Sequence, residues 1–368
     1  MARDRDPRDR DPGGTVVAVV LALAVGALVL AGWFPNVVVP DTGPGRIGLI
    51  SSLYDPPDRS IEVALNVGDG QIFATQAVDP LADRPETILG GPEEQAYRWQ
   101  RGAYGWIGWV ASAGQAEAAP WALAVVTVLA TGALVGVVAE VIRRRGGPPL
   151  AALFLLLTPG VITDLLFVGP EVLGAALVVA GVALAVRRPG SWGAVALLAA
   201  AGLCRETLLL VPAVLALVAL RRRQWEAAVR LALAAAPYVA WVVLLRLRLG
   251  AWPTGSSGGR LGLVPFGGMV EEMGGWGPDD IAGLALVAAL GLAGIVRARD
   301  TELRAVLAAH VLLAASFGPA VWSEAAHAGR VLLPLAALGL VAVASARGAG
   351  EDVLTDGDVE PVAVTAPA

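Results

Sequence analysis

The stretch WALAVVTVLATGALVGVVAEVIRRR, residues 121–145, decides the fold of this chain. From Trp121 to Ile142 it is almost entirely apolar, and it ends on three consecutive arginines, Arg143 to Arg145. An apolar run of about 20 residues crosses the hydrocarbon core of a bilayer as a helix. Arginines that follow such a helix mark its cytoplasmic end. The stretch therefore predicts a transmembrane helix that runs from the outside to the cytoplasm.

The composition of the whole chain agrees with this prediction. Its 368 residues are 56% hydrophobic and 16% charged, and the mean hydropathy is +0.66. Soluble domains contain about 25% charged residues, so the chain is predicted to be a polytopic membrane protein. All 27 basic residues are arginines at the ends of apolar runs, and nothing in this pattern supports nucleic-acid binding. Cys204 is the only cysteine, which excludes an intramolecular disulfide.

Further apolar runs predict the other membrane helices. The first run, Thr15–Trp33, is longer than a signal-peptide core and is followed by no small-residue cleavage site, which predicts a retained anchor. Single spans are also predicted at Ala227–Leu245, Ile281–Val296, Ala305–Val321 and Val331–Ala344.

Two longer apolar stretches predict helical hairpins. Residues 148–186 and 191–220 are each bracketed by cytoplasmic arginine clusters, so each must cross the membrane an even number of times. Polar residues mark the tips, near 164–171 in the first hairpin and at 204–207 in the second. At about 1.5 Å per residue, each half of the second hairpin reaches about 20 Å, short of a core of about 30 Å. Its tip is therefore predicted to lie below the outer surface, inside protein or a water-filled cavity.

These runs predict an all-α fold, a polytopic transmembrane helical bundle of about ten spans. The exclusive use of arginine, with abundant alanine, glycine and valine, indicates a GC-rich bacterial genome. We therefore expect the chain in the inner (plasma) membrane of a bacterium, with both termini in the cytoplasm. The predicted parts are a disordered cytoplasmic tail at 1–14, a transmembrane domain at 15–347 with outer loops at 35–120 and 250–280, and a second disordered cytoplasmic tail at 348–368.

Charged residues gather at the predicted outer ends of the spans. An ionised side chain in the middle of a bilayer costs about 2.5 to 3.5 kcal/mol unless it is paired. Beside the first outer loop, the clusters are Asp164 with Glu171, Arg205 with Glu206, and residues 324–330. Because all of these clusters lie on the same side of the membrane in the predicted topology, they predict a single outward-facing cavity lined by acids and arginines. The competing interpretation is that these groups only neutralise one another as structural ion pairs.

The first outer loop contains Asp69-Gly70-Gln71, which has two interpretations. An Asp-Gly pair commonly forms a turn in which the carboxylate bonds its own backbone. In the second interpretation, the Asp69 carboxylate is a general base that takes a proton from an acceptor hydroxyl. The local sequence alone favours the turn.

Aromatic and basic residues follow in the same loop. Tyr97, Arg101 and Tyr104 are spaced at i, i+4 and i+7, which predicts an interfacial helix over residues 97–110. The aromatic residues alone indicate only a membrane-surface anchor. The guanidinium groups of Arg98 and Arg101 can in addition clamp a phosphate.

Two further arginines, Arg205 and Arg330, stand at the outer ends of other spans and are predicted to join this clamp. His327 lies in the outer turn before Arg330, where a functional role is plausible. His310 falls within a span and is predicted to be a core residue.

The order of these motifs resembles that of the GT-C superfamily, integral-membrane glycosyltransferases that use polyprenyl-phosphate-linked sugars. The motifs that carry the resemblance are Asp69-Gly70-Gln71, Asp79-Pro80, Tyr97-Arg98-Trp99-Gln100-Arg101 with Tyr104, Pro159-Gly160 followed by Glu171, Arg205-Glu206-Thr207, and Arg330 with Pro334. Each motif is short, and it is their shared order over roughly residues 68–334 that carries the likeness. The resemblance implies a GT-C-like bundle with a catalytic carboxylate in the first outer loop, a role that falls on Asp69.

The sequence therefore favours a glycosyltransferase that moves a sugar from a polyprenyl-phosphate donor to an extracytoplasmic acceptor. Asp69 is the predicted general base, and arginines hold the lipid phosphate. The residues predicted to bind substrate are Gln71, Tyr97, Arg98, Arg101, Tyr104, Glu171, Arg205, Glu206, His327 and Arg330. No cofactor is predicted; a divalent metal ion is compatible with the loop carboxylates, but no spacing requires one. The predicted partners are the lipid-linked donor and membrane lipid.

Two other functions fit the same residues. A transporter or flippase for a polar lipid would also use charged groups within the membrane, although the absence of inverted internal repeats disfavours it. A membrane scaffold without catalytic activity is favoured if the Asp69 side chain points into its own turn.

Overall fold

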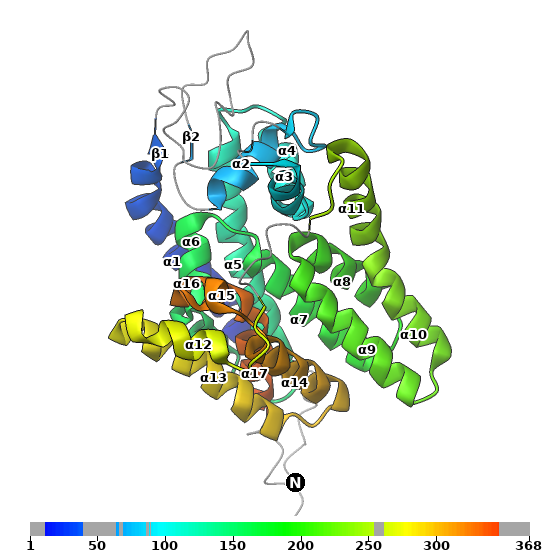
Figure 1. Cartoon of the computed structure of the whole chain (residues 1–368). Coiled ribbons are helices and arrows are strands. Elements are labelled where there is room, and N and C mark those ends of the chain that lie inside the picture. Colours follow the sequence, from blue (N-terminus) through cyan, green and yellow to red (C-terminus); the bar gives the residue numbers. More distant parts are fainter. Residues whose placement is uncertain are drawn as a thin grey trace, which may run out of the picture.

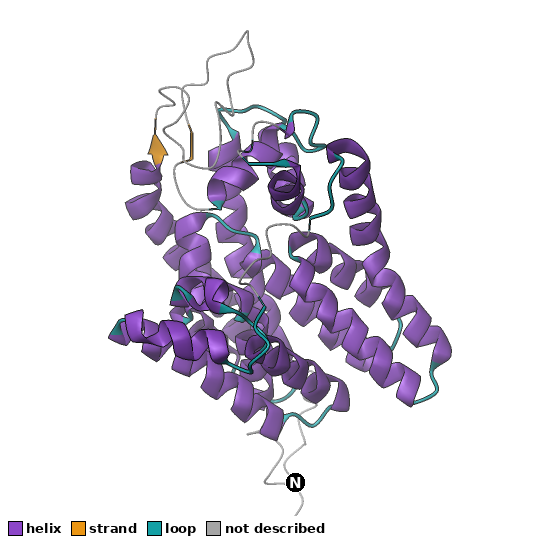
Figure 2. Ribbon diagram, in the orientation of Figure 1, coloured by secondary structure: helices purple, strands orange, loops and turns teal. Residues whose placement is uncertain are grey.

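The protein is described here from a computed structural model. Helices make up most of the described chain and loops connect them (Figure 2), which confirms the predicted all-α class. The exception is a short antiparallel strand pair, β1 (Val38–Val39) with β2 (Ala64–Leu65). Of the two tails predicted to be disordered, only residues 12–14 are described, and the rest lies outside the described residues. The residues that the structure describes are 12–39, 64–65, 69–85, 88, 90–253 and 261–345.

Long and short helices alternate along the chain (Figure 1). The first half contains α1 (Gly13–Val37), α2 (Gly70–Val78), α3 (Pro92–Trp99), α4 (Gly102–Ser112), α5 (Ala119–Arg144), η3 (Pro149–Leu157), α6 (Pro159–Phe167), α7 (Glu171–Arg187), α8 (Trp192–Cys204) and η4 (Glu206–Leu209). The second half contains α9 (Leu210–Arg221), α10 (Trp225–Ala232), η5 (Leu233–Ala235), α11 (Ala236–Leu249), α12 (Gly267–Glu272), η6 (Met273–Gly275), α13 (Pro278–Arg297), α14 (Thr301–Ala315), α15 (Pro319–Trp322), α16 (Ala325–Val331) and α17 (Leu333–Ser345).

Among the described residues, four helical segments are long and apolar enough to cross a membrane. They are Gly13–Trp33 within α1, α5, the run Trp225–Leu249 formed by α10, η5 and α11, and α13. The number rises to six if each of two bent pairs, η3 with α6 and α16 with α17, is one span. All of these segments fall on apolar runs that were predicted to enter the membrane. The remaining predicted crossings involve α7, α8, α9 and α14, which have 17, 13, 12 and 15 residues, so the count of ten stays a prediction.

Both apolar stretches predicted as hairpins break at the expected polar residues. In the first, α6 ends at Phe167 and α7 begins at Glu171, with Val168 between them in the left-handed region at φ 57°. In the second, α8 ends at Cys204 and the backbone of Arg205 is extended before η4 begins. The polar residues therefore interrupt the helices where a charged tip was predicted.

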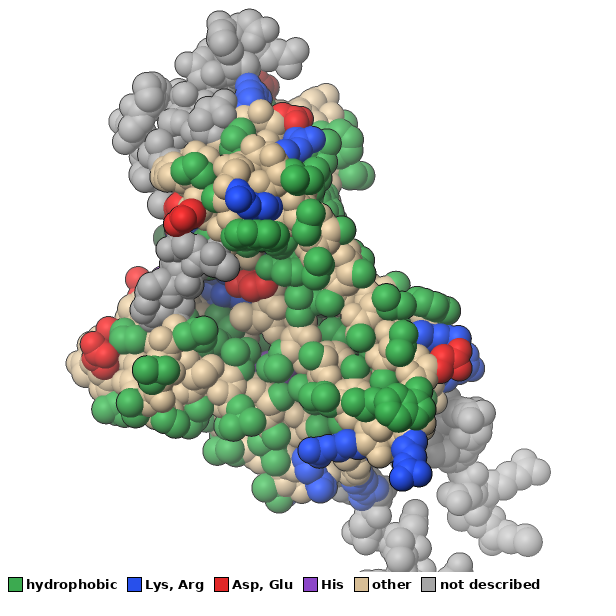
Figure 3. Space-filling view, turned by 45° about the vertical axis from the view of Figure 1, so that its right-hand side comes forward, with side chains coloured by type: hydrophobic (Ala, Val, Ile, Leu, Met, Phe, Trp, Pro, Cys, Tyr) green, Lys and Arg blue, Asp and Glu red, His purple; other side chains and the backbone are tan. Residues whose placement is uncertain are grey.

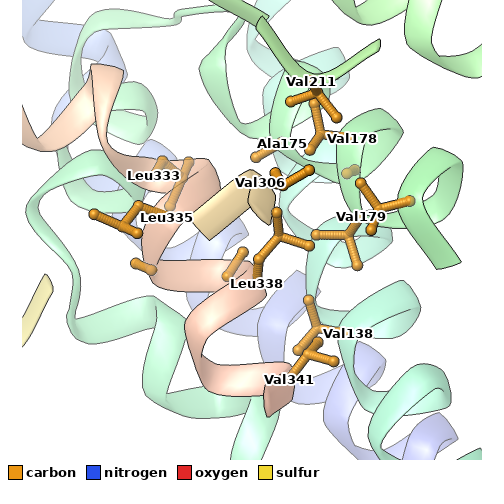
Figure 4. Packing of buried hydrophobic residues seen from close by; sticks show 14 of the residues in the cluster. Val138, Ala175, Val178, Val179, Val211, Val306, Leu333, Leu335, Leu338 and Val341 are labelled. Carbon is orange, nitrogen blue, oxygen red and sulfur yellow. The ribbon is translucent and has the colours of Figure 1, made fainter. Parts of the chain in front are cut away.

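The hydrophobic core lies where α5, α7, α14 and α17 meet (Figure 4). Val138 of α5, Val179 of α7 and Val306 of α14 are buried in one cluster with Leu338 and Val341 of α17. Close packing of such β-branched and leucine side chains fixes the relative positions of the helices. The ends of these helices are therefore held firmly enough to position a site.

α13 and α17 approach each other more closely than side chains would allow. A Cβ atom added at Gly339 of α17 would lie 2.4 Å from the carbonyl oxygen of Leu290 in α13. Small residues at helix interfaces permit this kind of backbone contact between membrane helices.

The three short helices α2, α3 and α4 form a cap over one end of the bundle, at the top of Figure 1. The Tyr104 hydroxyl of α4 donates a hydrogen bond to the carbonyl oxygen of Leu123 in α5 at 3.0 Å. The Trp241 indole nitrogen of α11 donates to the carbonyl oxygen of Trp99, the last residue of α3, at 3.0 Å. The cap is thus joined to two of the long helical segments by buried hydrogen bonds.

The prediction of one interfacial helix over residues 97–110 is wrong. α3 ends at Trp99 and α4 begins at Gly102, and the backbone of Arg101 between them is non-helical at φ −94° and ψ 61°. The break directs the Arg101 side chain toward Glu206 of η4, with which it pairs. A contact between distant segments has outweighed the local i, i+4 and i+7 spacing.

Arginines gather at the opposite end of the bundle from the cap, visible as blue side chains at the bottom of Figure 3. Arg145, after α5, pairs with Asp300 at 2.8 Å. Arg222, after α9, pairs with Glu302 of α14. The arginine clusters that predicted a common cytoplasmic side therefore do lie at one end of the molecule.

Candidate functional site

A cavity of about 630 Å³ lies between the cap and the bundle. Figure 3 shows acidic and basic side chains in a recess between the upper and lower parts of the molecule. The polar part of the cavity wall comprises Asp69, Tyr97, Arg98, Gln100, Arg101, Arg205, Glu206, Thr207, His327 and Arg330. The apolar part comprises Phe167, Pro253, Leu261, Leu313, Phe317, Ala320, Val321 and Val331. The cavity is therefore amphipathic, and within the described chain its wall carries four arginines against two carboxylates.

Asp69 stands immediately before α2, at the polar end of the cavity. Its side chain forms no capping hydrogen bond to the helix that it precedes. The carboxylate instead accepts one hydrogen bond from Arg98 Nη1 and one from Arg330 Nη2, each at 3.1 Å. A quarter of the side chain, 25%, is exposed to the cavity and solvent. Asp69 is therefore held by two guanidinium groups and does not point into its own turn.

Arg330 of α16 joins Asp69 to a second, more deeply buried acid. Its Nη2 nitrogen also donates to Glu171 Oε1 at 2.9 Å, and Glu171, the first residue of α7, is only 1% exposed. Glu171 Oε1 accepts a further hydrogen bond from Arg205, the residue that follows α8. These contacts link residues of four separate segments, so the packing of distant parts of the chain determines the position of the Asp69 carboxylate.

Arg101 forms the second ion pair of the site. Its Nε and Nη2 nitrogens donate to the two carboxylate oxygens of Glu206, both at 3.0 Å. Nη2 also donates to the hydroxyl oxygen of Tyr97 at 2.8 Å. A bidentate arginine–carboxylate pair fixes both side chains in one plane. The cap is thereby attached to η4 along the wall of the cavity.

Asp164 lies behind these residues and is completely buried. Its Oδ2 oxygen accepts a hydrogen bond from the backbone nitrogen of Val172 at 2.6 Å, and its Oδ1 oxygen is 3.9 Å from Arg330 Nε. In the sequence Asp164 was recognised only as a charged hairpin tip. In the structure it is a neighbour of Arg330 and Glu171. Asp164 and Glu171 are only seven positions apart, and the turn between α6 and α7 brings them together.

Several buried polar atoms of the site have no hydrogen-bond partner within the described part of the chain. Two are guanidinium nitrogens, Arg205 Nε and Arg330 Nε, and two are carboxylate oxygens, Asp164 Oδ1 and Glu171 Oε2. Buried polar groups are normally paired, so unpaired atoms beside a cavity indicate places for water or a ligand. Arg205 lines the cavity, and its Nε is one of these unpaired donors.

The charges around Asp69 determine its ionisation. Burial alone raises the pKa of its carboxyl group, but Arg330, Arg101 and Arg98 lower the pKa by a larger amount, so that the net pKa is below its ordinary value. For Arg101, burial lowers the pKa of the guanidinium group, but its pairing with Glu206 raises this pKa, so that the net pKa is above its ordinary value. Both groups are therefore ionised at neutral pH.

Eight of the eleven residues predicted for the site line the cavity: Asp69, Tyr97, Arg98, Arg101, Arg205, Glu206, His327 and Arg330. Glu171 lies directly behind Arg205 and Arg330. Gln71 is buried in α2 and does not line the cavity. Tyr104 does not line it either, because its hydroxyl is engaged with Leu123 and with Thr127 in the core.

Other residues of the cavity wall were not predicted. Gln100 accepts a hydrogen bond from the Tyr238 hydroxyl at 2.8 Å. Gln100 stands inside the motif Tyr97-Arg98-Trp99-Gln100-Arg101, so its place in that motif could have predicted that it lines the cavity. Phe167, Leu313 and Phe317 form part of the apolar wall. Nothing in the sequence distinguishes them from ordinary residues of a membrane helix.

Among the described residues, no group of three or more histidine, cysteine, aspartate or glutamate side chains is arranged to hold a metal ion. What the site contains is an ionised carboxylate beside arginines at the polar end of an amphipathic cavity. Such an arrangement can bind a phosphate and accept a proton. No protein-family model, no curated protein and no solved structure matches the chain.

Proposed function

We propose that this protein is a membrane glycosyltransferase of the GT-C type, which transfers a sugar from a polyprenyl-phosphate carrier to an acceptor hydroxyl. The observation that carries the proposal is the position of the Asp69 carboxylate, held at 3.1 Å by Arg98 and by Arg330 inside an amphipathic cavity. A carboxylate that only stabilised its own turn would accept hydrogen bonds from its own backbone and would not need two arginines from other helices.

The two parts of the cavity wall match the two parts of a lipid-linked donor. An isoprenoid chain is apolar and would lie along Phe167, Leu313 and Phe317. The phosphate and the sugar are polar and would lie among the four arginines. A water-soluble nucleotide sugar would gain nothing from the apolar wall. This difference favours a lipid carrier as the donor.

The proposed reaction is a displacement at the anomeric carbon of the sugar. The acceptor oxygen forms a bond to this carbon, and the bond between the carbon and the carrier phosphate breaks, with its electron pair remaining on the phosphate. Asp69 accepts the proton of the acceptor hydroxyl. Because the pKa of Asp69 is lowered, it is ionised but weakly basic, so it is most effective late in the reaction, when the attacking hydroxyl has become acidic.

Arginines of the cavity would stabilise the departing phosphate. Arg205 is the best placed, because the residue lines the cavity wall and its buried Nε lacks a partner among the described residues. Arg330 has a second role, since it holds Asp69 and Glu171 together. Cations placed in advance where negative charge develops lower the barrier of such a reaction.

The proposal includes an orientation in the membrane. The arginine ends of α5 and α9 would face the cytoplasm, as the positive-inside rule requires. The cap and the cavity lie at the other end, so transfer would take place on the outer face of a bacterial plasma membrane. About ten crossings, with both termini in the cytoplasm, would satisfy this arrangement if α7, α8, α9 and α14 also cross.

The proposal is tested by sugar transfer with the purified full-length protein, using a panel of polyprenyl-phosphate sugars and a hydroxyl acceptor. Asp69→Asn preserves the shape of the side chain and removes the charge. It should reduce kcat by at least about 100-fold, the usual contribution of a general base. The matched control is Asp279→Asn, which changes an exposed acid that does not line the cavity.

Binding of the donor is measured separately with each carrier lipid. Arg205→Ala should weaken binding of the polyprenyl-phosphate sugar, whereas Asp69→Asn should leave it nearly unchanged. A folded Asp69→Asn protein with wild-type turnover would remove Asp69 from the reaction. If no lipid-linked sugar binds to the wild-type protein, the proposed donor class is wrong.

A further inference from the structure

A second groove lies at the arginine end of the bundle, far from the Asp69 cavity. It has a volume of about 310 Å³ and runs between the last turns of α5 and the last turns of α7. Its apolar lining is formed by Gly136, Val137, Val141, Ala180, Ala183 and Leu184. The small residues leave the space open, because no long side chain fills it.

Arg144 and Arg187 stand at one end of this groove, and Glu140 lies about one helical turn further in. Glu140, Arg144 and Arg187 complete its lining. Glu140 accepts hydrogen bonds from Arg143 at 2.8 Å and from Arg144, so its charge is already neutralised within α5. Arg187, the last residue of α7, is exposed and has no ion pair within the described part of the chain. Arg144 is 49% exposed on the opposite side of the groove.

The length of the groove matches the part of one bilayer leaflet that lies nearest to the water. On α5 the lining residues extend from Gly136 to Arg144, which is about 12 Å along a helix. On α7 they extend from Ala180 to Arg187, about 10 Å. With the two arginines at the depth of the lipid phosphates, the apolar part would lie at the depth of the first acyl carbons.

We propose that this groove binds an anionic phospholipid of the adjacent leaflet, with an acyl chain between α5 and α7 and the phosphate between Arg144 and Arg187. Charge complementarity favours an anionic ligand. The mouth of the groove carries two exposed arginines, whereas its single acid, Glu140, is already paired. Basic pockets between membrane helices are suited to anionic headgroups. An apolar partner helix would fill the groove but would leave the exposed Arg187 guanidinium group without a counter-charge, since only Arg144 is paired with Glu140.

The proposal is tested with the full-length protein purified in a neutral detergent and delipidated. Phosphatidylglycerol and phosphatidylcholine with identical acyl chains are titrated in separate experiments, and bound lipid is counted by native mass spectrometry. Phosphatidylglycerol should be retained preferentially. Arg187→Gln should weaken its retention about fivefold, the effect expected for one basic residue near an anionic headgroup.

Two further variants make the result specific. Arg221→Gln removes a charge from the end of α9 but does not alter the groove, so it should retain phosphatidylglycerol like the wild type. Ala183→Phe fills the apolar part and should reduce retention although every charge is preserved. Equal losses in Arg187→Gln and Arg221→Gln, equal retention of the two lipids, or full retention by a folded Ala183→Phe protein would each overturn the proposal. Thermal unfolding of each variant establishes that it is folded.

Discussion

Arg330 Nη2 lies 3.1 Å from Asp69 Oδ2, although the two residues are separated by 261 positions in the sequence. The contact connects the first described residue of the cap region with α16, near the end of the described chain. It replaces the turn interaction that an Asp-Gly sequence would ordinarily form. The role proposed for Asp69 therefore depends on how the helices are packed, and not on its local sequence.

The first prediction concerns Arg330, which holds two carboxylates. Arg330→Gln should destabilise the protein by roughly 3 kcal/mol, because breaking one side of a buried ion pair leaves uncompensated charge. It should also lower kcat/KM for transfer, since Asp69 loses one of its two anchors. Thermal unfolding and kinetics measure the two effects. Arg297→Gln, at an exposed helix end, should change neither. Unaltered stability of Arg330→Gln would contradict the geometry described above.

The second prediction concerns the pH dependence of transfer. Burial raises the pKa of Asp69, but the surrounding arginines keep it below its ordinary value of about 3.9. The carboxylate then loses its charge only as the pH falls through this lowered value, so kcat/KM should stay constant from pH 7 to about pH 4. Arg98→Gln removes one cation, raises the pKa of Asp69 and should shift the acid limb to higher pH. Arg246→Gln, outside the cavity, should leave the limb in place.

The third prediction concerns the pair formed by Arg101 and Glu206. The single variants Arg101→Gln and Glu206→Gln should each destabilise the protein, because each leaves one charge of a bidentate pair without its partner. The double variant should be more stable than the sum of the single effects predicts, by about 1 to 3 kcal/mol. Unfolding free energies of all four proteins give this coupling. Additive effects would indicate that the pair does not attach the cap to η4.

The fourth prediction separates the two tyrosines that the sequence placed together. Tyr104→Phe should lower stability by about 0.5 to 1.5 kcal/mol, because it removes one buried hydrogen bond to the carbonyl oxygen of Leu123, which Thr127 still contacts. It should not change KM for the donor. Tyr97→Phe should change KM, since Tyr97 lines the cavity and contacts Arg101. A rise in KM for Tyr104→Phe alone would restore the original prediction that Tyr104 binds substrate.

The fifth prediction tests the packing of α13 on α17. Gly339→Ala would introduce a carbon 2.4 Å from the carbonyl oxygen of Leu290, so a backbone must move. We expect a loss of about 1 to 3 kcal/mol in unfolding free energy, the usual effect of overpacking. Gly274→Ala is the control, because no atom lies within 4 Å of the added carbon. Equal melting temperatures for the two variants would show that the helices are not so close.

Features that depend on hydrophobicity and charge were predictable from the sequence. The apolar run before Arg143 is α5, and the helices break at Gly169-Pro170 and at Arg205, where the hairpin tips were predicted. In a membrane, an interrupted apolar run can only be a helix end, a bend or a site, so these signals are strong. The same reasoning selected Arg205 and Glu206, which do line the cavity.

Features that depend on the packing of distant segments were not predictable. The spacing of Tyr97 and Tyr104 indicated one helix, but the pairing of Arg101 with Glu206, which is 105 positions away, requires a break there. Asp69 could not be distinguished from a turn residue without its contact to Arg330. Phe317 lines the cavity, yet its sequence context is that of any apolar segment. Tertiary contacts determine these three features, and such contacts leave no pattern in the local sequence.

The separation of Asp69 and Arg330 also has a consequence for biosynthesis. A ribosome that adds about 5 to 20 residues per second needs roughly ten to fifty seconds to extend the chain from one residue to the other. During that interval the Asp69 carboxylate has emerged without this partner, and Glu171 has reached the membrane with only Arg205 beside it. A chain that stops before α16 would lack Arg330, so Asp69 would keep only Arg98 and Glu171 would keep only Arg205 as an arginine partner.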